Sequence, residues 1–252
     1  MTEGYVRTWT EDNVAIVEFF HPASNSLPSS LLQKLATTIQ EAGQASDSKV
    51  IVLRSGGERA FCAGASFDEL AAITNESEGK AFFSGFANVI NAMRRCPKFI
   101  IGRVQGKAVG GGIGLIAATD YCLATQSAAI KLSELTVGIG PFVIEPAVKR
   151  KIGLAAVGHL TLNATNFESA MWAWQKGLYD DVYHTPEELD EHVATMAQQL
   201  ATYDPTSMRL VKEILWEGTD HWDTLLSQRA AMSGTLVLTD FTRKTLASLK
   251  KK

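Results

Sequence analysis

Short apolar runs alternate with amphipathic stretches along the first half of the chain. Residues 5–10 and 14–20 are rich in β-branched and aromatic side chains, which predicts two strands separated by a turn. Apolar residues then recur at helical spacing after Pro28, and a proline near that start is typical of a first helical turn. The apolar run 49–53 predicts a buried strand that ends at a glycine pair.

The same alternation continues towards the middle of the chain. Residues 76–95 carry large apolar side chains at helical spacing, and Pro97 ends this predicted helix. Further strands are predicted around residues 99–104, 120–124 and 129–133. Repeated strand–strand–helix units of this kind favour an α/β fold in which helices cover a mixed sheet.

From about Pro141 onward the pattern is almost entirely helical. Pro186 begins one predicted helix, and another is predicted from Thr206 to Gly218. No segment rich in Pro, Ser and Gly interrupts the chain as a linker. We therefore predict a single domain, with residues 1–185 forming the ββα core that carries the site and residues 186–252 forming a helical C-terminal segment.

Composition and charge exclude several classes of protein. The 252 residues are 46% apolar and carry a net charge of −3, so no nucleic-acid partner is predicted. The longest apolar run, near residues 108–118, is too short for a membrane span, and the N-terminus lacks the parts of a signal peptide. The three cysteines form no CxxC pair, which favours a reducing, cytoplasmic compartment. The five histidines show no HExxH or close metal spacing, so no metal is predicted.

Six of the 20 glycines fall between Gly102 and Gly114. Glycines allow a ligand to approach backbone N–H groups, and the start of a helix favours negative charge. A phosphate-binding loop would need Ser or Thr after Gly106-Lys107, where the chain has Ala108. Residues 112–117 match a dinucleotide fingerprint but lie in mid-chain after a very short strand, which disfavours a Rossmann domain. Tight helix packing remains a further explanation of the cluster.

A second glycine turn, at residues 59–65, follows the predicted strand 49–53. Two strand-end turns that converge could present two backbone N–H groups to one oxygen atom. Such a pair of donors is what a developing oxyanion on a thioester requires.

These turns carry a resemblance to a known family. Residues 60–65 (AFCAGA) together with 104–112 (VQGKAVGGG) resemble the crotonase, or enoyl-CoA hydratase/isomerase, family. Residues 25–27, 120–125 and 166–178 resemble further segments of the same family, so the resemblance extends over nearly the whole chain.

The resemblance implies a spiral of ββα turns with a helical C-terminal trimerisation segment, and homotrimers that often pair into hexamers. It implies an acyl-CoA thioester substrate, with coenzyme A as part of the substrate and no separate cofactor. By motif position, the N–H groups of Ala65 and Gly111 would hold the thioester oxygen. The residues that it places along the substrate are Arg59, Ala63, Phe67, Gly110 and Phe142. Arg59 is equally explained as an exposed turn charge, and Asp68 stands where some members have a CoA-binding lysine.

Hydratases of this family use two glutamates, and this chain keeps only one of them. The first glutamate position is Gly114, and the second is Glu134. A single carboxylate suits double-bond isomerisation, in which one group removes a proton and returns it to another carbon. Pro141-Phe142 also resembles Δ3,Δ2-enoyl-CoA isomerases, so Glu134 is predicted to be the catalytic acid/base. A simple helix-start role for Glu134 is the alternative.

Other reactions remain open at this stage. Hydration, by a generic or a methylglutaconyl-CoA type of hydratase, would need a second acid, for which Glu145 is a candidate. The 3-hydroxyisobutyryl-CoA hydrolases also have glycine at the Gly114 position, but they carry an Asp where this chain has Phe142. An acyl-CoA-binding subunit without catalytic activity is the alternative of another class.

Overall fold

The computed structural model describes residues 3–250, and its strands form two sheets. The main sheet has the order β1-β2-β3-β5-β7-β9, and only the β1–β2 pair is antiparallel. Its strands are β1 (Tyr5–Glu11), β2 (Val14–Phe20), β3 (Val50–Ser55), β5 (Phe99–Val104), β7 (Tyr121–Thr125) and β9 (Asp181–Tyr183). The small parallel sheet has the order β4-β6-β8 and consists of β4 (Ala60–Cys62), β6 (Lys107–Val109) and β8 (Ile130–Lys131).

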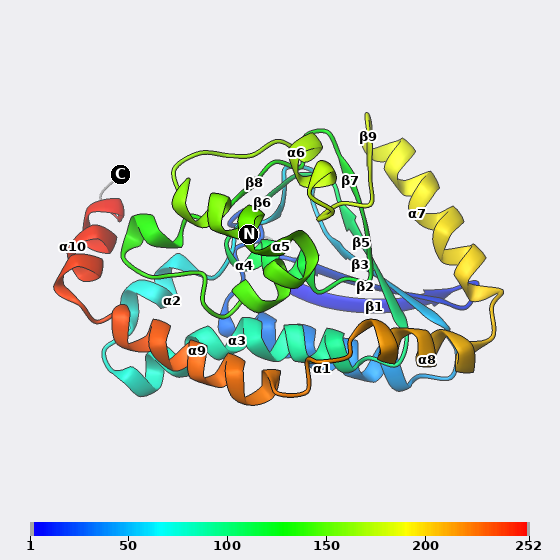
Figure 1. Ribbon diagram of the computed structural model, residues 1–252, viewed down its shortest axis with the longest axis horizontal. Helices are drawn as coiled ribbons and strands as arrows, with labels where there is room; N and C mark the ends of the chain where they lie inside the picture. Colours follow the sequence, from blue (N-terminus) through cyan, green and yellow to red (C-terminus); the bar gives the residue numbers. More distant parts are fainter. Residues whose placement is uncertain (1–2, 251–252) are drawn as a thin grey trace.

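Helices cover both faces of the main sheet (Figure 1). In the first part of the chain they are α1 (Ser29–Gln44), α2 (Phe67–Ala72), α3 (Glu76–Arg95), α4 (Gly111–Ala117) and the 3₁₀ helix η1 (Glu134–Val137). They continue as α5 (Glu145–Leu162), α6 (Ala170–Gln175), α7 (Pro186–Ala201), α8 (Pro205–Leu215), α9 (Trp222–Leu236) and α10 (Asp240–Leu249). The predicted α/β fold and the helical C-terminal segment are therefore confirmed.

Three successive units of the chain share one plan. Each places a strand in the main sheet, the next short strand in the small sheet, and then a helical segment: β3–β4–α2, β5–β6–α4 and β7–β8–η1. The strands of the small sheet are parallel, so their carboxyl ends meet at one edge. This repetition brings together three turns that lie far apart in the sequence.

The central strands of the main sheet are apolar on both faces because both faces are covered. In β3, Ile51 and Leu53 belong to the large core beneath α1, α3 and α4. Val50 and Val52 point the other way and pack with α7. The continuous apolar run that predicted a buried strand reflects this double burial.

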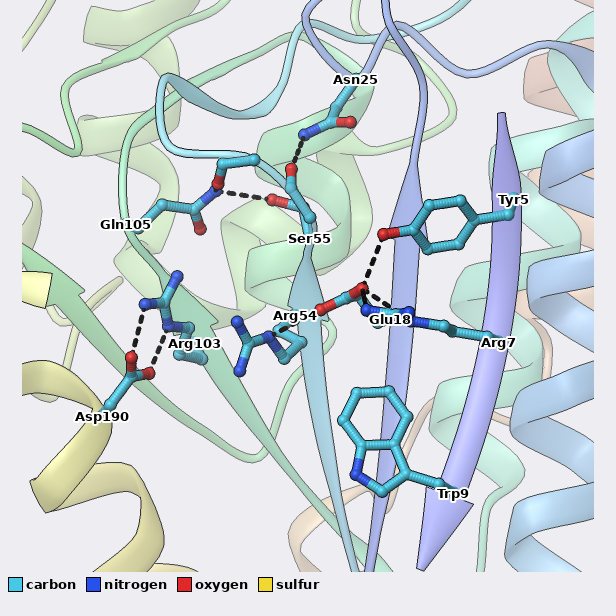
Figure 2. Close-up of polar contacts among 12 residues, drawn as sticks. Tyr5, Arg7, Trp9, Glu18, Asn25, Arg54, Ser55, Arg103, Gln105 and Asp190 are labelled. Carbon is cyan, nitrogen blue, oxygen red and sulfur yellow. Dashed lines mark hydrogen bonds and ion pairs between the residues drawn. The ribbon is translucent and has the colours of Figure 1, made fainter. Parts of the chain in front are cut away.

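A row of charged residues crosses the α7 side of the sheet at one level (Figure 2). Glu18, Arg54 and Arg103 are in register on β2, β3 and β5. The Glu18 carboxylate lies 2.6 Å from the Arg7 guanidinium and 3.1 Å from Arg54 Nε. Arg103 donates to both oxygens of Asp190, at 2.7 and 2.9 Å, which fastens α7 to the sheet.

The C-terminal helices pack onto the core and extend it. Helix α9 crosses α3 so closely that a Cβ on Gly79 would lie 2.7 Å from Gly234 Cα. Helix α10 folds back over η1 and α2 (Figure 1). Helix α8 is held by a buried ion pair, in which Lys212 Nζ lies 2.8 Å from Asp120 Oδ2. Among residues 3–250 no helix combines the length and the apolar character needed to cross a membrane.

Candidate functional site

A cavity of about 440 Å³ lies where the three short strands of the small sheet end. Its walls come from the turns that follow β4, β6 and β8, and from α2, α3, α9 and the segment after η1. Its volume is within the range of small-molecule sites. The two glycine turns singled out in the sequence and Glu134 all reach it.

The turn after β4 is held from one side by the segment before α1. The N–H of Leu27 donates to the Gly64 carbonyl at 2.8 Å, and the N–H of Ser66 donates back to the Leu27 carbonyl at 3.0 Å. The Ser26 hydroxyl donates to the Ala65 carbonyl at 2.8 Å. These bonds fix the peptide planes on both sides of Ala65, and they leave its N–H directed away from Leu27.

We call residues 25–27, which hold this turn, the clamp. Asn25 anchors the clamp through its side chain. Its Nδ2 donates to the carbonyls of Gly56 and Ala60, at 2.9 and 2.8 Å, while Oδ1 accepts the N–H of His21 at 2.7 Å. Asn25 is buried and has a φ of +57°, a left-handed conformation that asparagine tolerates better than most residues. The conformation is therefore stabilised by three hydrogen bonds from one buried amide.

The turn after β6 meets this clamp at the start of α4. Gly110 has a φ of +53° and donates its N–H to the Lys131 carbonyl at 3.0 Å. A Cβ on Gly64 would lie only 3.8 Å from Gly111 N, so the two turns touch. Among the hydrogen bonds of residues 3–250, neither the Ala65 N–H nor the Gly111 N–H has an acceptor. Both residues line the cavity, so two backbone donors without an acceptor among these hydrogen bonds lie in neighbouring turns of its wall.

Gly111 is also required by packing. A Cβ at this position would lie 2.6 Å from Cε1 of Phe86, whose ring belongs to α3 and lines the cavity. The aromatic ring therefore contacts the backbone directly, beside the free N–H.

Glu134 supplies the single carboxylate among the described residues that line the cavity. Glu134 is the first residue of η1, in the turn that follows β8. Its Oε1 would lie 3.0 Å from a Cβ built on Gly110. Its Oε2 is buried and has no hydrogen-bond partner among the described residues. Burial raises the pKa of Glu134 to about 7, against a smaller lowering by its own backbone N–H. The carboxylate is thus poised to gain or lose a proton near neutral pH.

The place of a second carboxylate is filled by hydrocarbon. A Cβ on Gly114 would overlap the Cγ2 methyl of Ile144 and lie 2.8 Å from its Cβ. Ile144 is buried and lines the cavity. The absence of a carboxylate at Gly114 is therefore built into the packing of α4 against the segment before α5.

The other predicted site residues divide into two groups. Ala63, Phe67 and Gly110 line the cavity, together with Ala65, Gly111 and Glu134. Arg59, Phe142 and Glu145 do not line it. Arg59 is exposed, the Phe142 ring packs against Gly140, and Glu145 begins α5 with its carboxylate 3.4 Å from Lys149.

Several lining residues carried no motif in the sequence. The aromatic stripe of α3 was recognisable as a helical face, and Phe82, Phe83 and Phe86 of that face reach the cavity. Ile144 and Ser233 come from segments remote in sequence, and only the folded chain places them there. Further wall residues without a motif are Leu70, Val137, Ile139 and Val143, whereas Ser26 belongs to the segment 25–27 that resembles the family.

Comparison with known proteins assigns the chain to one family. The family model described as "Enoyl-CoA hydratase/isomerase" matches residues 9–248. The chain belongs to this family, the crotonase superfamily, and is an enzyme of it.

Relatives within the family carry different activities. The chain is 29% identical to a short-chain-enoyl-CoA hydratase of Clostridium acetobutylicum, over 82% of this chain and 79% of the relative. It is 26% identical to a peroxisomal Delta(3,5)-Delta(2,4)-dienoyl-CoA isomerase of Arabidopsis thaliana, over 76% of this chain and 72% of the relative. The solved structure of an enoyl-CoA hydratase from Bacillus halodurans superposes with a TM-score of 0.90, at 20% identity, over 97% of this chain and 99% of that one. This last likeness shows the fold.

Proposed function

We propose that the protein isomerises the double bond of an enoyl-CoA thioester, with Glu134 as its only acid/base. The observation that carries this proposal is that a carboxylate whose Oε2 is buried without a hydrogen-bond partner lines the same cavity as two free backbone N–H groups. The Ile144 side chain packs against Gly114, where the family resemblance predicts the other glutamate. The relationship to a dienoyl-CoA isomerase supports the same class of reaction.

In the proposed reaction the thioester oxygen binds between the N–H groups of Ala65 and Gly111. Ionised Glu134 removes a proton from C2 of a 3-enoyl thioester, and the electron pair moves to the oxygen to give a dienolate. The protonated Glu134 then returns the proton to C4, and the double bond lies between C2 and C3. One proton leaves and one returns, so no water or redox partner is consumed. Each oxyanion donor is expected to lower the barrier by roughly 2.7–4 kcal/mol.

The acidity of Glu134 suits both halves of this shuttle. A group with a pKa of about 7 is ionised in a large fraction of molecules at neutral pH. It is also acidic enough, once protonated, to give the proton back. A fully solvated carboxylate would be a weaker base for a carbon acid.

Coenzyme A enters this scheme as part of the substrate, and the proposal includes no separate cofactor and no metal. Arg59 is exposed and lies outside the cavity, where it could meet the phosphates of the coenzyme. We keep the cytoplasm as the expected location.

We also propose that the protein assembles as a homotrimer or as a hexamer of two trimers. Helix α8 supports self-association because it leaves a row of large apolar side chains between 47% and 62% exposed: Leu210, Val211, Ile214 and Leu215. Sedimentation analysis of the wild type and of Ile214→Glu tests this. A wild type that sediments as a monomer contradicts it.

Hydration is the second candidate function, favoured by the relationship to a short-chain-enoyl-CoA hydratase. It needs a group that activates water, and Glu134 is the only carboxylate among the described residues that line the cavity. The deciding experiment offers 3-hexenoyl-CoA and 2-hexenoyl-CoA to the purified protein and follows the double bond, the hydroxyacyl product and free CoA. Isomerisation that is lost in Glu134→Gln supports our proposal. Hydration without isomerisation refutes it, and binding without turnover identifies a silent acyl-CoA-binding subunit.

A further inference from the structure

The part of the cavity beyond Glu134 has an almost purely hydrocarbon wall. It is built from α2, α3 and the segment after η1, and it is backed by side chains of α9 and α10. The residues that face the cavity here and join this apolar cluster are Phe67, Leu70, Phe83, Val137 and Ile139. Val237 and Leu246 stand behind them. Helix α10 therefore backs this wall with an apolar side chain of the same protomer.

Polar groups that could hold an anion are lacking at this wall. No Lys, Arg or His lines the cavity within the part of the chain that the structure describes. Two of the lining hydroxyls already donate their protons, since Ser26 bonds to the Ala65 carbonyl and Ser233 to the Arg229 carbonyl at 3.3 Å. Ser133, the remaining hydroxyl, adjoins Glu134 at the reacting end.

Such a wall favours uncharged acyl groups over charged ones. Each methylene buried against it strengthens binding about fourfold, whereas a second carboxylate would lose its hydration without gaining a partner. Glu134 shows the effect within this cavity, because burial is the main cause that raises its pKa to about 7. A second anion would also be repelled by ionised Glu134.

We infer that the enzyme selects thioesters of uncharged hydrocarbon acids and rejects those whose acyl group carries a second carboxylate. This inference rests on the proposed function for the orientation of the acyl group, with its thioester at Ala65 and Gly111. It excludes the methylglutaconyl-CoA type of substrate and assigns the wall around Leu70 as the element that determines specificity.

The test compares substrates that differ only at the far carbon. Hexanoyl-CoA and adipoyl-CoA lack a double bond, and their affinities for the wild-type protein are measured by calorimetry. We expect adipoyl-CoA to bind at least about 100-fold more weakly. The ratio of kcat/KM for 3-hexenoyl-CoA over 3-hexenedioyl-CoA should be at least as large. Equal affinities within this pair would overturn the inference.

The two proposals fail in different ways. If hexanoyl-CoA binds preferentially but neither enoyl thioester is isomerised, the specificity stands and the proposed function fails. If both enoyl thioesters are isomerised equally well, the function stands and the specificity fails.

A charge placed in the wall should reverse the preference. Leu70→Arg puts a guanidinium at the cavity, and we expect it to strengthen adipoyl-CoA binding at least tenfold relative to hexanoyl-CoA. Leu154→Arg is the matched control, because Leu154 is 72% exposed on α5 and lies outside the cavity. An equal change in both variants would assign the effect to general surface charge and contradict the role of the wall. If Leu70→Arg does not fold, the wild-type comparison decides alone.

Discussion

Because the Glu134 carboxylate is desolvated, we predict that Glu134→Gln stabilises the protein and abolishes its activity. The carboxyl pKa is raised from its ordinary value of 4.5 to about 7 in the folded protein, chiefly by burial. Each tenfold change in a protonation equilibrium is worth about 1.4 kcal/mol, so ionising Glu134 is about 3 kcal/mol more costly in the folded chain than in the unfolded one. Glu134→Gln keeps the shape and removes this cost.

The sign of the pH dependence follows from proton binding. Between pH 4.5 and about 7 the folded state keeps the Glu134 proton while the unfolded state releases it. The stability of the wild type therefore falls as pH rises through this window, and that of Glu134→Gln lacks this component. We expect the variant to be more stable by about 3 kcal/mol near pH 8 and by less than about 1 kcal/mol near pH 5.

Urea unfolding at both pH values, at one protein concentration, measures this difference. Glu145→Gln is the matched control, because that carboxylate begins α5 outside the cavity and pairs with Lys149 at 3.4 Å. The reasoning is wrong if Glu134→Gln gains nothing near pH 8, or if its gain is the same at both pH values. In the same preparations, isomerase activity of Glu134→Gln should fall by roughly 10²- to 10⁴-fold.

Three further predictions follow from the same geometry. Isomerase kcat/KM should rise with pH and level off above about 7, as Glu134 ionises, and a flat profile from pH 5 to 8 would exclude it as the base. Gly111→Ala forces a Cβ against the Phe86 ring, so we expect a loss of about 1–3 kcal/mol in urea unfolding, together with lower kcat; unchanged kcat would argue against an oxyanion donor here. Asn25→Ala removes three hydrogen bonds and leaves the Gly56 carbonyl unpaired, so it should cost at least about 2 kcal/mol. Its rate loss should resemble that of Ser26→Ala in affecting kcat more than KM. A change confined to KM would show that the clamp does not position the Ala65 N–H.

The local sequence pattern was sufficient to predict most of the helices and strands and to locate the two glycine turns. Prolines marked the start of α1, the end of α3 and the start of α7 close to where the structure has them. The strand predicted at 129–133 overlaps β8 but is longer than it, whereas β4 lies inside the segment 59–65 that was predicted as a turn, because three residues are too few for a period to show. Their pairing is set by the larger strands that precede them, which is a property of the whole sheet.

The sequence by itself determined that Gly114 stands at the first glutamate position of the family and that a carboxyl group, that of Glu134, stands at the second. Only the tertiary structure decided the environment of that group. Contacts between segments distant in the chain produce the burial that raises the pKa of Glu134, place the Ile144 methyl over Gly114, and back the apolar wall with α10. Desolvation and packing depend on every neighbour in space, and no single stretch of sequence contains those neighbours.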